Sequence, residues 1–148
     1  MTPQGIAVLV AASLALGACK GGETPTSPTS PTTPTTTTVA EPTTTEEFTG
    51  TLPVGGSSFY SFTVEQNGTV RVTFAAVGGT NVPPSIWLGL GLGAPAGEDC
   101  ATTSSLNTQA GTSPQLSGTY APGIYCVRVA DIGNLAAPAR FTITIDHP

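Results

Sequence analysis

Few side chains in this chain of 148 residues carry catalytic or metal-binding chemistry: it has one histidine, four basic residues and nine acidic ones. His147 precedes the last residue, where we expect the chain to fray and not to hold a base beside a nucleophile. One histidine and one pair of cysteines are too few ligands for an ordinary zinc site, and no phosphate-binding loop ending in Lys-Ser/Thr is present. We therefore expect no catalytic residue, no metal and no cofactor, and predict that the protein is not an enzyme.

Carboxylates are the one group of reactive side chains that spacing alone leaves open. Glu98, Asp99, Asp131 and Asp146 could converge in space as a general acid–base pair. A calcium site built from Glu98, Asp99 and Asp131 is the weaker alternative, because calcium takes six to eight oxygen ligands. Since Glu98 and Asp99 are adjacent in a polar segment, we expect them to lie on a solvated loop.

The first of the three cysteines closes an apolar run over residues 5–18. The stretch Leu16-Gly17-Ala18-Cys19 resembles a bacterial lipoprotein signal, in which the thiol of Cys19 takes up a lipid and becomes the new N-terminus. The apolar run is shorter than the roughly 20 residues that a transmembrane helix needs. The alternative is a plain secretory signal cut after Ala18, and residues 1–4 lack the basic side chain typical of both signals.

Lipidation of Cys19 would leave Cys100 and Cys126 as a disulfide pair in an oxidising compartment. Lys20 stands where aspartate is the usual inner-membrane retention signal, so the resemblance implies the outer membrane, facing the periplasm or the exterior. The formal net charge of −5 argues against binding nucleic acid or an anionic bilayer through charge. The predicted contact with the membrane is therefore the N-terminal lipid.

Residues 19–45 are dominated by threonine, proline and serine, with a proline at every third position from Pro25 to Pro34. Almost nothing in this segment can be buried, so we expect a disordered linker with a polyproline II bias. Fully extended, such a linker would hold a domain about 80 Å from the lipid. The expected organisation is a signal peptide at 1–18, a lipid-anchored linker at 19–45 and one domain at 46–148. Glycosylation of the linker threonines is left open.

From Glu46 onward, apolar residues alternate with a period of two, and no helical period is present. Strands are expected at 48–52, 58–64, 69–75, 85–93, 124–130 and 141–145, with shorter ones around 100–103 and 115–119. Asn67-Gly68 predicts a two-residue hairpin between the second and third of these strands. Short strands separated by turns predict a single small antiparallel β-sandwich.

The expected strand at 85–93 places its large aliphatic residues on one face and Trp87 with three glycines on the other: Ile86, Leu88, Leu90 and Leu92 against Gly89, Gly91 and Gly93. The glycine strip is either a platform for a flat ligand or sugar ring, or a surface on which another segment lies. Cys126 is expected on the outer face of its strand, so a bond to Cys100 would clamp the intervening loop over that face. We therefore expect a covered Trp87 ring; if the aromatics are open to water, Trp87 and Tyr120 are the candidate ligand contacts.

Segments 50–52, 59–64, 122–129 and 141–145 resemble the landmarks of the bacterial pre-peptidase C-terminal domain. That family is a small jelly-roll-like β-sandwich, usually appended to secreted proteases or found in surface proteins. The resemblance implies a fold and no catalysis, because its landmarks are hydrophobic residues and glycines. This chain departs from the family in lacking a peptidase domain and in having the cysteine pair.

Two classes of function follow from these expectations. The first is a surface-displayed interaction module that binds a surface protein or a glycan, and the second is a structural spacer; a secreted accessory domain without a lipid is a further alternative. Exposed aromatic side chains on the domain would favour the binding module, whereas a uniformly polar Thr/Ser surface would favour the spacer.

Overall fold

The structure, a computed structural model, describes residues 39–148, so the predicted signal, Cys19 and the predicted linker up to residue 38 lie outside the described residues. Eight β-strands and no helix form this part of the chain, which therefore contains no helix able to span a membrane. The strands are β1 (Thr44–Leu52), β2 (Ser57–Val64), β3 (Gly68–Gly78), β4 (Leu88–Ala96), β5 (Asp99–Thr108), β6 (Leu116–Tyr120), β7 (Gly123–Ala130) and β8 (Ala139–His147).

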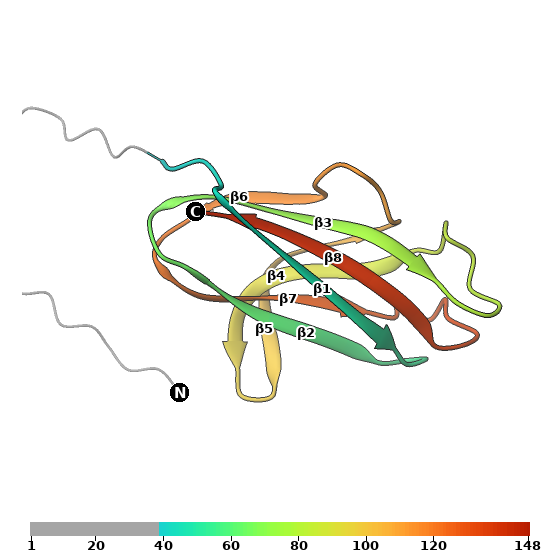
Figure 1. The fold of residues 1–148 in the computed structure, drawn as a ribbon. Helices are drawn as coiled ribbons and strands as arrows, with labels where there is room; N and C mark the ends of the chain where they lie inside the picture. The colour runs from blue at the N-terminus through green and yellow to red at the C-terminus, as the bar shows by residue number, and fades with distance from the viewer. Residues whose placement is uncertain (1–38) are drawn as a thin grey trace, which may run out of the picture. The chain divides into compact units, whose positions relative to one another are not determined.

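The strands form two antiparallel four-stranded sheets that pack as a sandwich (Figure 1). The first sheet has the order β1-β8-β3-β6 and the second has the order β2-β7-β4-β5. Eight antiparallel strands divided in this way between two sheets form a jelly-roll-like sandwich. The β-sandwich predicted from the alternation of apolar residues along the chain is therefore confirmed.

The core lies between the sheets and is built from the predicted inward-facing positions. Val72 and Ile145 contribute from the first sheet, and Leu90 and Val127 contribute from the second. Each of these side chains is almost fully buried, which for a residue of this size stabilises the fold by about 1.5–3 kcal/mol. The aliphatic face predicted for Ile86 to Leu92 is confirmed, since all four of its residues belong to the core.

The hairpin predicted at Asn67-Gly68 is wrong. The strands on either side of this turn lie in different sheets, because β2 pairs with β7 whereas β3 pairs with β6 and β8. Neither turn residue has the positive φ that a two-residue hairpin requires. Gly68 is needed for a different reason: a Cβ there would lie 2.6 Å from the Ala40 carbonyl oxygen and equally close to the Pro148 ring.

The sandwich takes in residues just before Glu46. Ala40 forms an isolated parallel bridge with Gly68, and its N–H donates to the Asn67 carbonyl at 3.0 Å. β1 starts at Thr44, opposite His147 on β8. The chain thus enters the domain beside the C-terminus, at one end of the strands (Figure 1).

Candidate functional site

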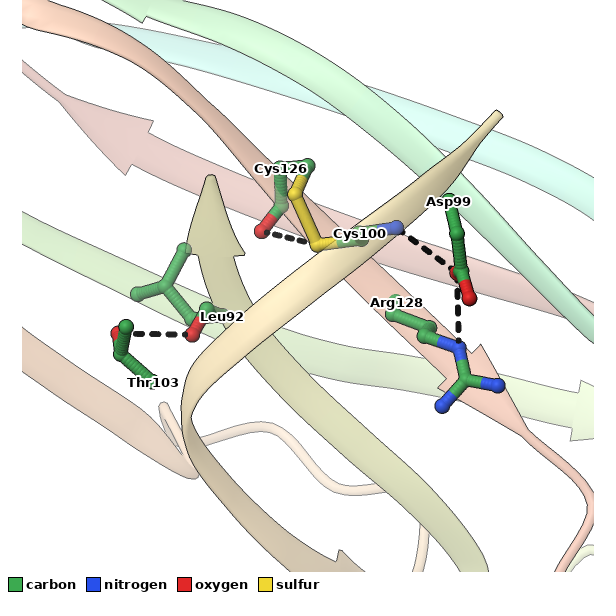
Figure 2. Close-up of a disulfide and its surroundings, with 6 residues drawn as sticks. All are labelled: Leu92, Asp99, Cys100, Thr103, Cys126 and Arg128. Atoms are coloured by element: carbon green, nitrogen blue, oxygen red, sulfur yellow. Dashed lines mark hydrogen bonds and ion pairs between the residues drawn. A yellow bond between two sulfur atoms is a disulfide. The ribbon is translucent and has the colours of Figure 1, made fainter. Parts of the chain in front are cut away.

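The predicted disulfide between Cys100 and Cys126 is confirmed, and both residues are buried. It joins β5 to β7, two strands of the second sheet that are separated by β4. Figure 2 shows the bond where β5 crosses β7, with the Asp99–Arg128 ion pair beside it at 3.4 Å. The crossing requires Gly93 on β4, because a Cβ at this position would collide with the Ala101 carbonyl group.

The expectation of a covered Trp87 ring is wrong, since half of this residue is exposed. The segment between the two cysteines forms β5 and β6 and not a loop laid over the sheet. β4 begins only at Leu88, so Trp87 belongs to the preceding loop. The disulfide draws the start of β5 over Gly93 at the far end of β4, and this leaves the Trp87 end open.

The glycine strip itself is a surface on which other segments lie. A Cβ on Gly91 would collide with the Thr102 side chain, and one on Gly89 would lie 3.3 Å from the Ile132 side chain. A hollow of about 420 Å³ remains beside these contacts, bordered also by Asn107 and Arg128. Of the two interpretations of the glycine strip, a ligand platform or a surface covered by another segment, the second fits these contacts.

Three loops at one end of the sandwich each carry a large exposed apolar side chain. Val54 in the β1–β2 turn is 52% exposed, Trp87 in the β3–β4 loop is 50% exposed, and Ile132 in the β7–β8 loop is 42% exposed. These three residues are called the loop patch below. The three loops lie at the end opposite the C-terminus (Figure 1), so the patch is remote from the point at which the chain enters the domain.

Asp131 joins two of these loops through its carboxylate. One oxygen accepts the Gly55 N–H at 2.7 Å, and the other accepts the N–H groups of the residues that follow it: Gly133 at 2.9 Å, Asn134 at 2.9 Å and Leu135 at 3.2 Å. Burial raises the pKa of Asp131, but these four donors stabilise the charged form and together hold the pKa below its ordinary value. The Asp131 N–H also donates to the Gly56 carbonyl at 2.9 Å.

The third loop, between β3 and β4, is also held by hydrogen bonds from neighbouring side chains. The Asn134 side-chain amide donates to the Trp87 carbonyl at 3.2 Å, and the Gln109 amide donates to the Ser85 carbonyl. The backbone that carries the loop patch is therefore fixed by side chains from neighbouring segments. Little conformational entropy remains to be lost when a partner binds there.

Tyr120, the other predicted aromatic contact, lies far from the patch. It ends β6 opposite Gly68, at the end of the sandwich where the chain enters. Its ring packs against the core and stands edge-on to Tyr125, with the ring centres 5.0 Å apart. Burial and then the neighbouring Tyr125 raise the pKa of its hydroxyl. The structure therefore does not bring Trp87 and Tyr120 into one site.

The four candidate carboxylates are likewise dispersed. Asp99 pairs with Arg128, Asp146 accepts a hydrogen bond from Thr45 on the first sheet, and Asp131 holds the loops together. Glu98 precedes β5 in the turn of the β4–β5 hairpin. Among residues 39–148 no three histidine, cysteine or acidic side chains are grouped to hold a metal ion, and the calcium site suggested for Glu98, Asp99 and Asp131 is not formed.

The expectation that His147 frays is wrong, because it is a buried residue of β8. Its Nε2 lies 2.9 Å from a carboxylate oxygen of Glu46, and its Nδ1 lies 3.3 Å from the Pro148 carbonyl oxygen. Its ring also packs on Phe62, with centroids 5.4 Å apart. Both ring nitrogens thus have partners, and the side chain joins the last strand to the first.

Asp131 is the residue whose role the sequence analysis missed. The sequence Asp131-Ile132-Gly133-Asn134 is typical of a turn in which an aspartate accepts hydrogen bonds from the backbone just after it. Gly133 adopts the positive φ of 92° that this turn requires.

No family model matches the chain, and no curated protein matches it.

Proposed function

We propose that the protein is a non-catalytic lipoprotein of a bacterial surface, whose β-sandwich is an interaction module held away from the membrane by the Thr/Pro-rich linker. The anchor rests on the sequence Leu16-Gly17-Ala18-Cys19. The bond between Cys100 and Cys126 supports export, because such bonds persist in oxidising compartments. The resemblance to pre-peptidase C-terminal domains agrees with an accessory, non-catalytic module.

The exposure of Trp87 is the observation that favours an interaction module over a spacer. A spacer needs only a polar surface, whereas three large apolar side chains are open to water at one end of this domain. Tryptophan supplies a large contact area and is enriched among the residues that dominate binding energy. The patch lies at the end remote from Ala40, so a tether through the linker leaves it accessible to a surface protein or glycan.

Two variants separate this proposal from its alternatives. Trp87→Ala should reduce retention of partners from a cell-surface fraction by about thirtyfold, as expected for a dominant contact. Ile124→Ala is the matched control, because Ile124 is 63% exposed but is the second residue of β7, at the opposite end of the domain. Equal retention of both variants would contradict the role of the patch.

The anchor is tested on its own with Cys19→Ala. We expect this variant to leave the membrane fraction while the parent chain stays in it. A Cys19→Ala chain as membrane-bound as the parent would mean that another feature attaches the protein.

A further inference from the structure

The outer face of the first sheet has a groove of about 1140 Å³ near the loops at one end of the strands. It crosses β1, β8 and β3, which lie side by side in this sheet (Figure 1). Outward-facing residues form two rows along its floor: Thr49, Thr142 and Ala76 in the first row, and Thr51, Arg140 and Gly78 in the second. Thr80 and Pro138, from two of the loops, border the same space. These residues define the Arg140 groove.

The outward-facing residues that β3 contributes to the groove are small. A bulge between Phe74 and Ala76 places both Ala75 and Ala76 at the surface. Gly78 follows on the same strand, and a Cβ at this position would meet no other atom within 4 Å. Because Gly78 is the cross-strand neighbour of Arg140, open space lies directly beside the arginine.

The charge of Arg140 is not compensated by a carboxylate of the described chain. The other two arginines of residues 39–148 are each paired: Arg71 with Glu41, and Arg128 with Asp99. Arg140 is exposed and forms no ion pair within these residues. The lining of the groove also contains no acidic residue. The groove is therefore a local positive site on a chain whose formal net charge is −5.

The groups around Arg140 match a sugar that carries a carboxylate. A guanidinium binds a carboxylate through two parallel hydrogen bonds, with a geometry that an ammonium group lacks. The hydroxyls of Thr51 and Thr142 can each donate to and accept from sugar hydroxyls. Pro138 and Ala76 add apolar surface for the C–H groups of a sugar ring.

A peptide matches the floor of the groove less well than a sugar does. A bound peptide strand gains its affinity from main-chain hydrogen bonds to an open sheet edge. Here β8 lies between β1 and β3 and is paired with both, so its backbone groups are used within the sheet. The floor therefore offers a ligand side-chain hydroxyls and a guanidinium, and no free row of backbone groups.

We infer that the Arg140 groove binds a glycan in which a single carboxylate lies among neutral sugars. A polymer with a negative charge on every unit would be repelled by the net charge of the chain. Glu47, which lies beyond Thr49 on the same face of β1, would repel a second carboxylate further along the sheet. The inference goes beyond the proposed function and uses no residue of the loop patch.

Titration calorimetry of the full chain carrying Cys19→Ser tests the ligand class. The probe is a xylotriose that carries one glucuronic acid, and the reference is the same oligosaccharide with its carboxyl group methyl-esterified. We expect the acid to bind with a dissociation constant of about 1 mM or lower, and the ester to bind about tenfold more weakly. Equal affinities, or no heat of binding from the acid at about 10 mM, would overturn the inference. Tighter binding of a capped tripeptide with one glutamate would overturn the choice of a glycan.

Two substitutions test the position of the site. Arg140→Gln should weaken binding of the acid about tenfold and leave binding of the ester unchanged. Arg71→Gln is the matched control, because it removes the same charge from the same sheet, seven positions before Gly78 on β3. It should bind the acid as the parent does. Equal losses in the two variants would mean that net charge and not the groove governs binding, which would refute the inference.

A carboxylate placed inside the groove gives a test that unfolding cannot mimic. Gly78 has no positive φ and has open space around it, so a side chain should be tolerated there. Gly78→Glu should pair with Arg140 and abolish binding of the acid, whereas Gly78→Gln, which has the same size, should retain most of it. Melting curves of both variants check that they are folded. Full binding by Gly78→Glu, or an equal loss in Gly78→Gln, would contradict a carboxylate site at Arg140.

Discussion

Replacing Asp131 with alanine removes one side chain that closes two loops. Four backbone N–H groups lose their acceptor: Gly55, Gly133, Asn134 and Leu135. A buried hydrogen bond to a charged group contributes about 1.5–3 kcal/mol, but these bonds are largely exposed and water can replace the carboxylate, so we take about 0.5 kcal/mol for each. The expected loss is about 2 kcal/mol, or about 8 °C in the melting temperature of a domain of this size.

The stabilisation that Asp131 provides should decrease as the pH falls. The pKa of Asp131 in the folded protein is lowered, so its contribution is present above the unfolded value of about 3.9 and is lost as pH falls through the folded pKa. Thermal unfolding of parent and Asp131→Ala, followed at pH 7 and in steps below pH 4, should show a gap that closes in acid. Asp131→Asn keeps one acceptor oxygen and should lose about half as much stability. Equal melting temperatures at pH 7, or a gap that does not narrow as the pH is lowered below the unfolded value, would refute the reasoning.

Three further predictions concern the stability of the domain. Trp87 is half exposed, so Trp87→Ala should change the free energy of unfolding by less than about 1 kcal/mol. Leu90 is buried in the core, so Leu90→Ala should lower that free energy by about 2–5 kcal/mol. A comparable loss for both variants would mean that the indole is covered. Reduction of Cys100–Cys126, which spans 26 positions, should cost about 3–4 kcal/mol in chain entropy, and calorimetry showing no shift on reduction would argue against that account. Gly68→Ala should destabilise the domain by about 1–3 kcal/mol in denaturant titrations, since its Cβ meets the Ala40 carbonyl; full stability would show that the entering segment can move aside.

Local sequence patterns predicted the strands because the alternation of apolar residues is short-range information, whereas the disulfide was predicted from the number of cysteines. Alternating residues such as Phe141, Ile143 and Ile145 specify which face of a strand is buried wherever its partner lies. Asn67-Gly68 is a turn signal, but a turn does not specify whether the next strand returns to the same sheet. That choice depends on the packing of whole sheets, and here the chain crosses to the opposite sheet.

The candidate site was less predictable because it is assembled from loops. The sequence placed Trp87 on an outer face but could not show that the disulfide pulls β5 over the other end of β4. Asp131 contacts Gly55, which lies 76 positions earlier in the chain. The sequence around Asp131 therefore could not show that Gly55 would be its partner. His147 has the chain position of a fraying residue, yet its pairing with Glu46 and Phe62 depends on contacts of equally long range.

The geometry of β1 has a mechanical consequence. The strand runs from Thr44, opposite His147, to Leu52, opposite Ala139, so a tether and a partner at the loop patch would pull on opposite ends of the β1–β8 ladder. Such a load acts in shear, and its nine paired positions resist together, whereas a pull between the two termini would open them one after another. Forced unfolding follows the unfolding rate under load. We therefore expect a markedly higher rupture force in single-molecule pulling between Val39, which precedes β1, and Ile132, which precedes β8, than between Val39 and Pro148. Equal forces would show that this ladder does not bear the load.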